Sequence, residues 1–222
     1  MDLLQQTDEL FFTRTNLDLE HTSKIVRDAL AGGDDGELFL EMRHAEMLAF
    51  DDGRLKTASY DQSSGFGLRA VAGEAHGYAH AGELSEAALQ RAADSVSAVT
   101  KGYSGNAALA PSAGANNPLY SDQNPLNATS FDTKIKLLQE MDAYARDSDS
   151  RVKQVSASLT GSWQAVQIMR ADGIRVADIR PLVRINIWVA VEQNGRMESG
   201  GAGAGGRVML DQWLSPESWQ SQ

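Results

Sequence analysis

Residues 182–192 read Leu182-Val183-Arg184-Ile185-Asn186-Ile187-Trp188-Val189-Ala190-Val191-Glu192, and Gln193-Asn194-Gly195 follow them. Every second residue from 183 to 191 is valine or isoleucine. Such alternation places these side chains on one face of a strand. Asn-Gly tolerates the positive φ angles of a type I′ turn, so the strand is expected to turn back on itself. The stretch therefore predicts an antiparallel hairpin with one buried face.

Similar alternation and turn residues recur upstream. Strands are predicted at about 37–43, 55–61, 65–72 and 76–81. Turns are expected at Asp51-Asp52-Gly53 and Gly73-Glu74, because glycine and aspartate accept positive φ. In the last third of the chain, segments 152–160 and 163–170 are predicted to form a hairpin across Gly161-Ser162, with another turn at Asp172-Gly173.

Apolar residues at helical spacing predict helices at about 2–12, 19–31 and 85–100, and another that begins near 130. Asp18, Ser85 and Ser130 are suitable N-caps. The expected fold class is α+β, with mixed or antiparallel β-sheets and flanking helices. The expected organisation is a first domain at 1–101, a long connection rich in Gly, Ala, Pro and Asn at 102–129, and a strand-rich segment at 130–222.

Composition excludes several classes of function. The 222 residues include no cysteine, which rules out disulfides, iron–sulfur clusters and cysteine nucleophiles. The net charge of −10 disfavours direct nucleic-acid binding, which depends on clustered Lys and Arg. We expect no membrane span, because no apolar run approaches about 20 residues. The start of the sequence does not resemble a signal peptide, so a cytoplasmic protein is expected.

The histidines are weak metal-ligand candidates. His76 and His80 have a spacing that would suit a helix, but their surroundings predict a strand, on which four residues span about 13 Å. Zinc ligands lie about 2 Å from one ion, so both cannot reach it. His44 and Glu46 share a strand face without a second cluster, and His21 is expected to face solvent from its helix.

A glycine-rich run near the end is the main candidate for binding. It comprises Gly200, Gly201, Ala202, Gly203, Ala204, Gly205, Gly206 and Arg207. The run formally contains Gly-x-Gly-x-x-Gly, but no helix follows to make a dinucleotide site. It is either a flexible linker or backbone that must approach another group closely. We favour close approach, since Arg196 and Arg207 flank the run and would orient a carboxylate or a carbonyl.

Two tryptophans near the end allow two interpretations. Trp213 and Trp219 either pack on the core, which is the commoner fate of tryptophan, or mark an exposed interaction surface.

Several separated segments resemble the PmbA/TldD family of metalloproteases. Residues 52–60, 65–74 and 77–79 resemble the family's first domain, while 178–184 followed by 200–207 resemble the TldD branch. The resemblance covers nearly the whole chain. It implies the amino-terminal half of a zinc-dependent peptidase that acts on unfolded or flexible peptides, pairs with a PmbA/TldE-like subunit, and belongs to a family also described as modulators of DNA gyrase.

In the family, zinc is held by a His-Glu-x-x-x-His helix and a later cysteine. No histidine here is followed by glutamate, and there is no cysteine. The resemblance therefore assigns no catalytic or metal-binding residue to this chain, which is expected to be inactive alone. It implies a domain that shapes the substrate passage and the partner interface, with residues 200, 201, 203, 205, 206 and 207 as candidate peptide-binding positions. The alternative is a stand-alone, non-catalytic peptide-binding or regulatory module.

Overall fold

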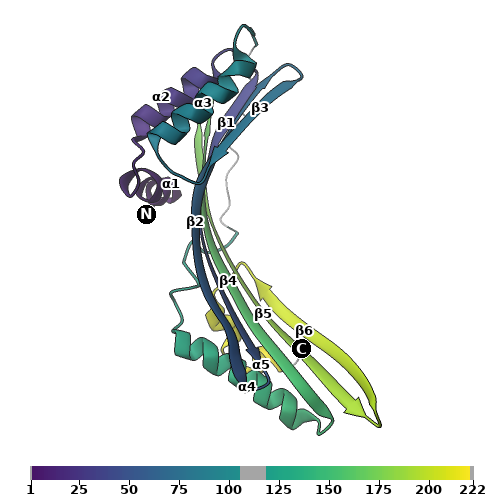
Figure 1. The fold of residues 1–222 in the computed structure, drawn as a ribbon. Coiled ribbons are helices and arrows are strands. Elements are labelled where there is room, and N and C mark those ends of the chain that lie inside the picture. The colour runs from purple at the N-terminus through teal and green to yellow at the C-terminus, as the bar shows by residue number, and fades with distance from the viewer. Residues whose placement is uncertain (1, 106–118, 221–222) are drawn as a thin grey trace. The chain divides into compact units, whose positions relative to one another are not determined.

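The computed structural model describes residues 2–105 and 119–220, so the middle of the predicted 102–129 connection lies outside the described residues. The helices are α1 (Leu3–Asp8), the π-helical turn η1 (Glu9–Thr13), α2 (Leu19–Leu30), α3 (Glu86–Thr100), α4 (Phe131–Ser148), the 3₁₀ turn η2 (Leu210–Trp213) and α5 (Pro216–Trp219) (Figure 1). The strands are β1 (Asp35–Asp51), β2 (Arg54–Ala72), β3 (Ala75–Ala81), β4 (Val152–Arg170), β5 (Arg175–Gln193) and β6 (Arg196–Gly206). The predicted α+β class is confirmed.

The six strands form one sheet in the order β3-β2-β1-β4-β5-β6. β2 pairs antiparallel with β3, with Ala72 opposite Ala75 next to the turn. β5 pairs antiparallel with β6, with Gln193 opposite Arg196. The predicted hairpins at Gly73-Glu74 and Asn194-Gly195 are therefore present, and β6 stands at one end of the strand order.

The described residues fall into two compact units that interleave along the chain. One unit contains 2–43, 63–105 and 164–179, and the other contains 44–62, 119–163 and 180–220. β1, β2, β4 and β5 each contribute residues to both units. The division into consecutive domains at 1–101, 102–129 and 130–222 stays a prediction.

The first unit combines α2 and α3 with strands. Both helices begin at their predicted caps, since the Asp18 carboxylate accepts from His21 N and the Ser85 hydroxyl accepts from Ala88 N. α3 packs against α2 and against β3. Its approach to β3 is close at Gly77, where a Cβ would lie 2.9 Å from Val99 Cγ2. A larger residue there would have to displace the Val99 side chain.

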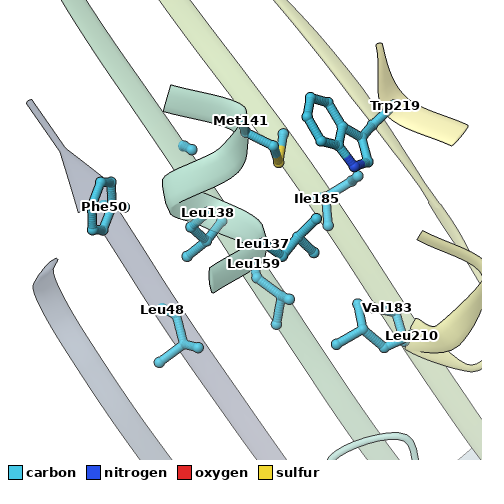
Figure 2. Packing of buried hydrophobic residues seen from close by; sticks show 11 residues of the cluster. Leu48, Phe50, Leu137, Leu138, Met141, Leu159, Val183, Ile185, Leu210 and Trp219 are labelled. Carbon is cyan, nitrogen blue, oxygen red and sulfur yellow. The ribbon is translucent and has the colours of Figure 1, made fainter. Parts of the chain in front are cut away.

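The second unit is built around α4, which Ser130 caps as predicted. One stripe of this helix packs with the buried side chains of β1, β4 and β5 (Figure 2). The cluster comprises Leu48, Phe50, Leu137, Leu138, Met141, Ala157, Leu159, Val183, Ile185, Leu210 and Trp219. Val183 and Ile185 belong to the alternating stretch, so the buried face predicted from it is confirmed at these positions.

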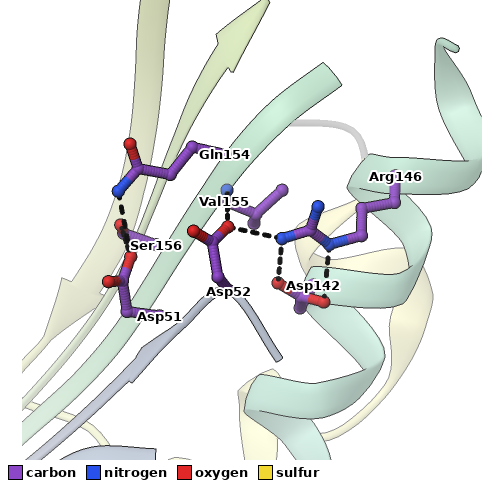
Figure 3. Close-up of polar contacts among 7 residues, drawn as sticks. All are labelled: Asp51, Asp52, Asp142, Arg146, Gln154, Val155 and Ser156. Carbon is purple, nitrogen blue, oxygen red and sulfur yellow. Dashed lines mark hydrogen bonds and ion pairs between the residues drawn. The ribbon is translucent and has the colours of Figure 1, made fainter. Parts of the chain in front are cut away.

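The predicted turn between β1 and β2 is held by side chains as well as by its backbone. Asp52 has a φ of 47° and is followed by Gly53 at 73°. The Asp52 carboxylate accepts hydrogen bonds from Arg146 Nη2 at 2.7 Å and from Val155 N at 3.2 Å (Figure 3). Beside it, Ser156 and Gln154 donate to Asp51 and hold the pKa of that carboxyl below its usual value. The turn is thereby attached to β4 and to α4.

The hairpin predicted across Gly161-Ser162 is wrong. Residues 152–170 form the single strand β4, and Gly161 has no positive φ. A Cβ on Gly161 would lie 2.6 Å from Leu126 Cδ2, so glycine makes room there for a neighbouring side chain. The segments 55–61 and 65–72 are likewise parts of one strand, β2.

None of the helices in the described part of the chain is long and apolar enough to cross a membrane.

Candidate functional site

The glycine-rich run forms most of strand β6. In the β5–β6 hairpin, Gly201 is opposite Trp188, Gly203 opposite Asn186, and Gly205 opposite Arg184. The turn has the predicted Asn194-Gly195 geometry, with φ angles of 56° and 80°. The flexible-linker interpretation is therefore wrong, because cross-strand pairing holds this backbone as an extended strand.

The direction of the β6 backbone groups follows from the turn. In a two-residue hairpin the residues next to the turn, here Gln193 and Arg196, form a hydrogen-bonded pair. Hydrogen-bonded and non-hydrogen-bonded pairs then alternate along the ladder. Counting from Arg196, residues 201, 203 and 205 fall in non-hydrogen-bonded pairs, so their N–H and C=O groups point away from β5. Three glycines thus present backbone donors and acceptors at the end of the sheet.

Atoms of β5 lie close to the Cβ positions of these three glycines. A Cβ on Gly201 would lie 2.8 Å from two ring atoms of Trp188. A Cβ on Gly203 would lie 2.5 Å from Asn186 Oδ1, and one on Gly205 would lie 2.3 Å from the Val183 carbonyl oxygen. Gly200 has no atom within 4 Å of its Cβ position, and Gly206 has none closer than 3.9 Å. The close approach predicted for the run therefore occurs at three alternate glycines, and their neighbours belong to β5.

The opposite face of β6 anchors the strand. Ala202 and Ala204 are opposite Ile187 and Ile185, and Ala204 packs against the core cluster of the second unit. β6 therefore has a packed face with small alanines and an open face with glycines.

The two flanking arginines already have contacts within the chain. Arg196 Nη2 lies 2.6 Å from Glu198 Oε1, and the Arg196 side chain is 82% exposed. The guanidinium of Arg207 lies over the ring of Tyr120, 5.1 Å from its centroid. An exposed pair such as Arg196–Glu198 is weak and would be readily exchanged for another partner.

Sequence reasoning missed the most prominent exposed aromatic side chain of this region. Trp188 is 58% exposed, whereas Trp219 is 6% exposed and belongs to the core cluster. Trp213 packs against the same cluster. The exposed-surface interpretation of Trp213 and Trp219 is therefore wrong. The available signal was the position of Trp188 between Ile187 and Val189, which assigns it to the face opposite the core.

The four histidines lie on α2, β1 and β3. His76 and His80 are on β3, as predicted, and the His80 ring stacks on Tyr78 with centroids 5.7 Å apart. His44 contacts the rings of Tyr60 and Trp163, and its burial lowers its pKa. Glu46 pairs with Lys134, while His21, predicted to face solvent, is about half exposed and pairs with Glu86.

No three His, Cys, Asp or Glu side chains within residues 2–105 and 119–220 are grouped as a metal ion requires. The residues described here therefore do not fit the metal that a metallopeptidase implies.

Comparisons with known proteins give a consistent family. The profile of the PmbA/TldA metallopeptidase domain 1 matches residues 36–100, and that of the PmbA/TldA metallopeptidase central domain matches 124–220. The Metalloprotease TldD homolog of Haemophilus influenzae is 38% identical over 214 residues, which are 94% of this chain and 44% of that protein. The homolog from Buchnera aphidicola of Acyrthosiphon pisum is 33% identical over 186 residues, 83% of this chain and 38% of that protein.

Solved structures show the same fold at low sequence identity. TldE from Thermococcus kodakarensis matches with a TM-score of 0.69 and 14% identity, over 84% of this chain and 43% of that one. A candidate modulator of a DNA gyrase from Thermotoga maritima matches with a TM-score of 0.72 and 13% identity, over 89% of this chain and 45% of that one.

The chain spans less than half the length of these relatives. The two family profiles together cover most of its residues, and the aligned relatives cover nearly all of them. The chain therefore belongs to the PmbA/TldD metallopeptidase family.

Proposed function

We propose that this chain is the amino-terminal, peptide-holding portion of a TldD-like metalloprotease. Its alignment covers 44% of the Haemophilus relative. The sequence contains neither His-Glu-x-x-x-His nor cysteine, so the zinc-binding and peptide-cleaving residues would come from the other half of the family protein. This portion would shape the substrate passage and contact a PmbA/TldE-like partner subunit.

The outer edge of β6, with which no strand of the described residues pairs, is the observation that carries the proposal. An extended peptide adds to such an edge through main-chain hydrogen bonds, which give affinity without demanding a particular sequence. Natural edge strands are usually blocked by charged residues, proline or bulges. Residues 199–206 contain no charged residue and no proline. An unblocked edge suits a protein that takes unfolded or flexible peptides.

A proline at position 203 tests the edge directly. We expect Gly203→Pro to weaken the binding of a fluorescein-labelled ten-residue Ser/Thr peptide to the 222-residue chain by about fivefold. One outward N–H donor, worth about 1 kcal/mol, is lost. The β5–β6 ladder would survive, because this N–H points away from β5. Fluorescence anisotropy gives the Kd, and circular dichroism checks the fold.

Gly203→Ala is the matched control, because it adds a Cβ beside Asn186 as proline does but keeps the N–H. Its Kd should stay nearer to that of the wild type. Equal losses in the two variants would mean that crowding against Asn186, rather than the backbone donor, controls binding. If the wild-type chain bound no extended peptide, the proposal would be contradicted.

The size of the native product tests whether this chain is a portion. We expect an antibody against residues 131–148 to recover, from the source cells, a polypeptide of about twice 24.0 kDa whose peptide map contains His-Glu-x-x-x-His. Intact-mass spectrometry makes the measurement. A native product of 222 residues would instead support a stand-alone, non-catalytic peptide-binding or regulatory module.

A further inference from the structure

Trp188 lies where a peptide added to β6 would meet it. Its Cα is paired with that of Gly201, and its ring covers the Cβ position of that glycine. Because Gly201 has no side chain, the indole can lie over this glycine, and Trp188 remains 58% exposed. A bulkier residue at 201 would occupy the site of the indole. Gly201 therefore allows the indole of Trp188 to lie above β6, the last strand of the sheet order.

A guanidinium lies over Gly203, on the same face as the indole over Gly201. Arg184 Nε donates to Asn186 Oδ1 at 2.8 Å, and Arg184 Nη2 lies 3.3 Å from the Cβ position of Gly203. Asn186 Nδ2 in turn lies 3.4 Å from Ser158 Oγ on β4. Arg184 is exposed, and the hydrogen bond that its Nε donates goes to the neutral amide of Asn186. The side chains at 186 and 158 orient this charge and do not neutralise it.

The pairing rules of a sheet place two peptide side chains over these groups. Directly opposed residues on neighbouring strands project to the same face, with their Cβ atoms about 5 Å apart. A peptide residue opposite Gly201 would therefore project beside Trp188, and one opposite Gly203 would project beside Asn186 and Arg184. These two peptide residues are two positions apart, because intervening residues face the other way.

We propose that the open face of β5 and β6 selects peptides that carry a large apolar or aromatic residue two positions from an acidic residue. The inference rests on the proposed peptide-binding function and adds a specificity to it. Trp188 would contact the apolar side chain, and Arg184 would pair with the carboxylate. Both are specificity-determining residues, since neither is required for the main-chain hydrogen bonds to β6.

The negative net charge of the chain makes a preference for acidic peptides informative. A chain with a net charge of −10 attracts basic peptides and repels acidic ones through its overall field. A preference for glutamate would therefore have to come from a local group such as Arg184. The probe is a fluorescein-labelled Ser/Thr peptide with Glu-Thr-Phe-Thr-Glu at its centre, so that either strand direction presents the same pair. Comparison peptides replace Phe with Thr, both Glu with Gln, or both Glu with Lys.

We expect the 222-residue chain to bind the Phe/Glu probe roughly tenfold more tightly than the probe with Thr in place of Phe, measured by anisotropy. Trp188→Ala and Trp188→Gln should remove this preference and leave the affinity for the plain Ser/Thr peptide unchanged. Trp188→Gln retains a long side chain over Gly201. It therefore tests the role of the indole even if the alanine variant disturbs β6. Tyr78→Ala is the control, because Tyr78 is an exposed aromatic residue on β3, the strand at the other end of the order, and its ring covers Gly67 of the neighbouring strand β2. It should change neither affinity.

A second experiment reverses the charge at position 184. Arg184→Glu should weaken the binding of the Glu probe and strengthen the binding of the Lys probe, so that the Lys probe becomes the tighter ligand of the two. A preference for Phe that survives both Trp188 variants, or an order that survives Arg184→Glu, would overturn the inference while peptide binding itself stood. Wild-type protein that binds no probe, the plain Ser/Thr peptide included, would overturn the inference together with the proposed function.

Discussion

Replacing Lys134 with alanine is expected to lower the free energy of unfolding by about 3–5 kcal/mol, which is the usual effect of removing one partner of a buried ion pair. The Lys134 side chain is 3% exposed, and its ammonium group donates to Glu46 and to the Leu126 carbonyl oxygen. Glu46 is only 12% exposed. Its carboxylate would therefore remain buried without a cation, and that desolvated charge accounts for the large effect.

Urea unfolding followed by circular dichroism measures the change, and a lysine on the same helix provides the control. Lys136 is 74% exposed and pairs with Glu140 one turn along α4. Lys136→Ala should change the free energy of unfolding by no more than about 0.5 kcal/mol. Similar small losses in both variants would mean that the Lys134–Glu46 pair is hydrated. The double variant Lys134→Met/Glu46→Leu should recover most of the loss, because it leaves no unpaired charge.

Trp219→Ala is expected to destabilise the second unit by about 3–5 kcal/mol, the range for truncating a buried aromatic residue. Trp219 is 6% exposed, lies against the core cluster beside Met141 and Ile185 (Figure 2), and contacts the Tyr144 ring edge-on at a centroid distance of 5.7 Å. Its Nε1 has no hydrogen-bond partner among the described residues, so the loss would come from packing.

The control for this prediction is Trp188→Ala, which removes the same type of side chain from an exposed position. It should have a much smaller effect on the urea midpoint. If the Trp219 and Trp188 variants unfolded at the same urea concentration as the wild type, α5 would not be held on the core. The pair of measurements thus separates the structural tryptophan from the one assigned to peptide recognition.

Local chemistry made much of this fold predictable. Asp18, Ser85 and Ser130 were expected to cap helices, and each side chain accepts the expected backbone hydrogen bond. Asn194-Gly195 was expected to turn a hairpin and does so. In these cases the residue acts on backbone groups within three positions of itself, so a short stretch of sequence contains all the necessary information.

The errors share a different cause. Glycine at 161 predicts a turn because glycine accepts positive φ, but there it makes room for Leu126, which is 35 positions away in the chain. The glycine-rich run was compatible with a flexible linker for the same reason. Its pairing with β5 shows that it is a strand and which β5 residue is opposite each glycine. Trp213 and Trp219 were ambiguous, because burial depends on which distant surfaces meet.

The sequence by itself determined the helix starts at Asp18, Ser85 and Ser130, the hairpin turn at Asn194-Gly195, the α+β class and, through resemblance, the family. The alternation of 183–191 also determined which β5 side chains could enter a core. Only the tertiary structure decided that β6 stands at the end of the strand order and that Trp188 and Arg184 lie over its glycines. The physical reason is range: caps and turns are completed by neighbouring residues, whereas an edge and the space above a glycine exist only after remote strands have paired.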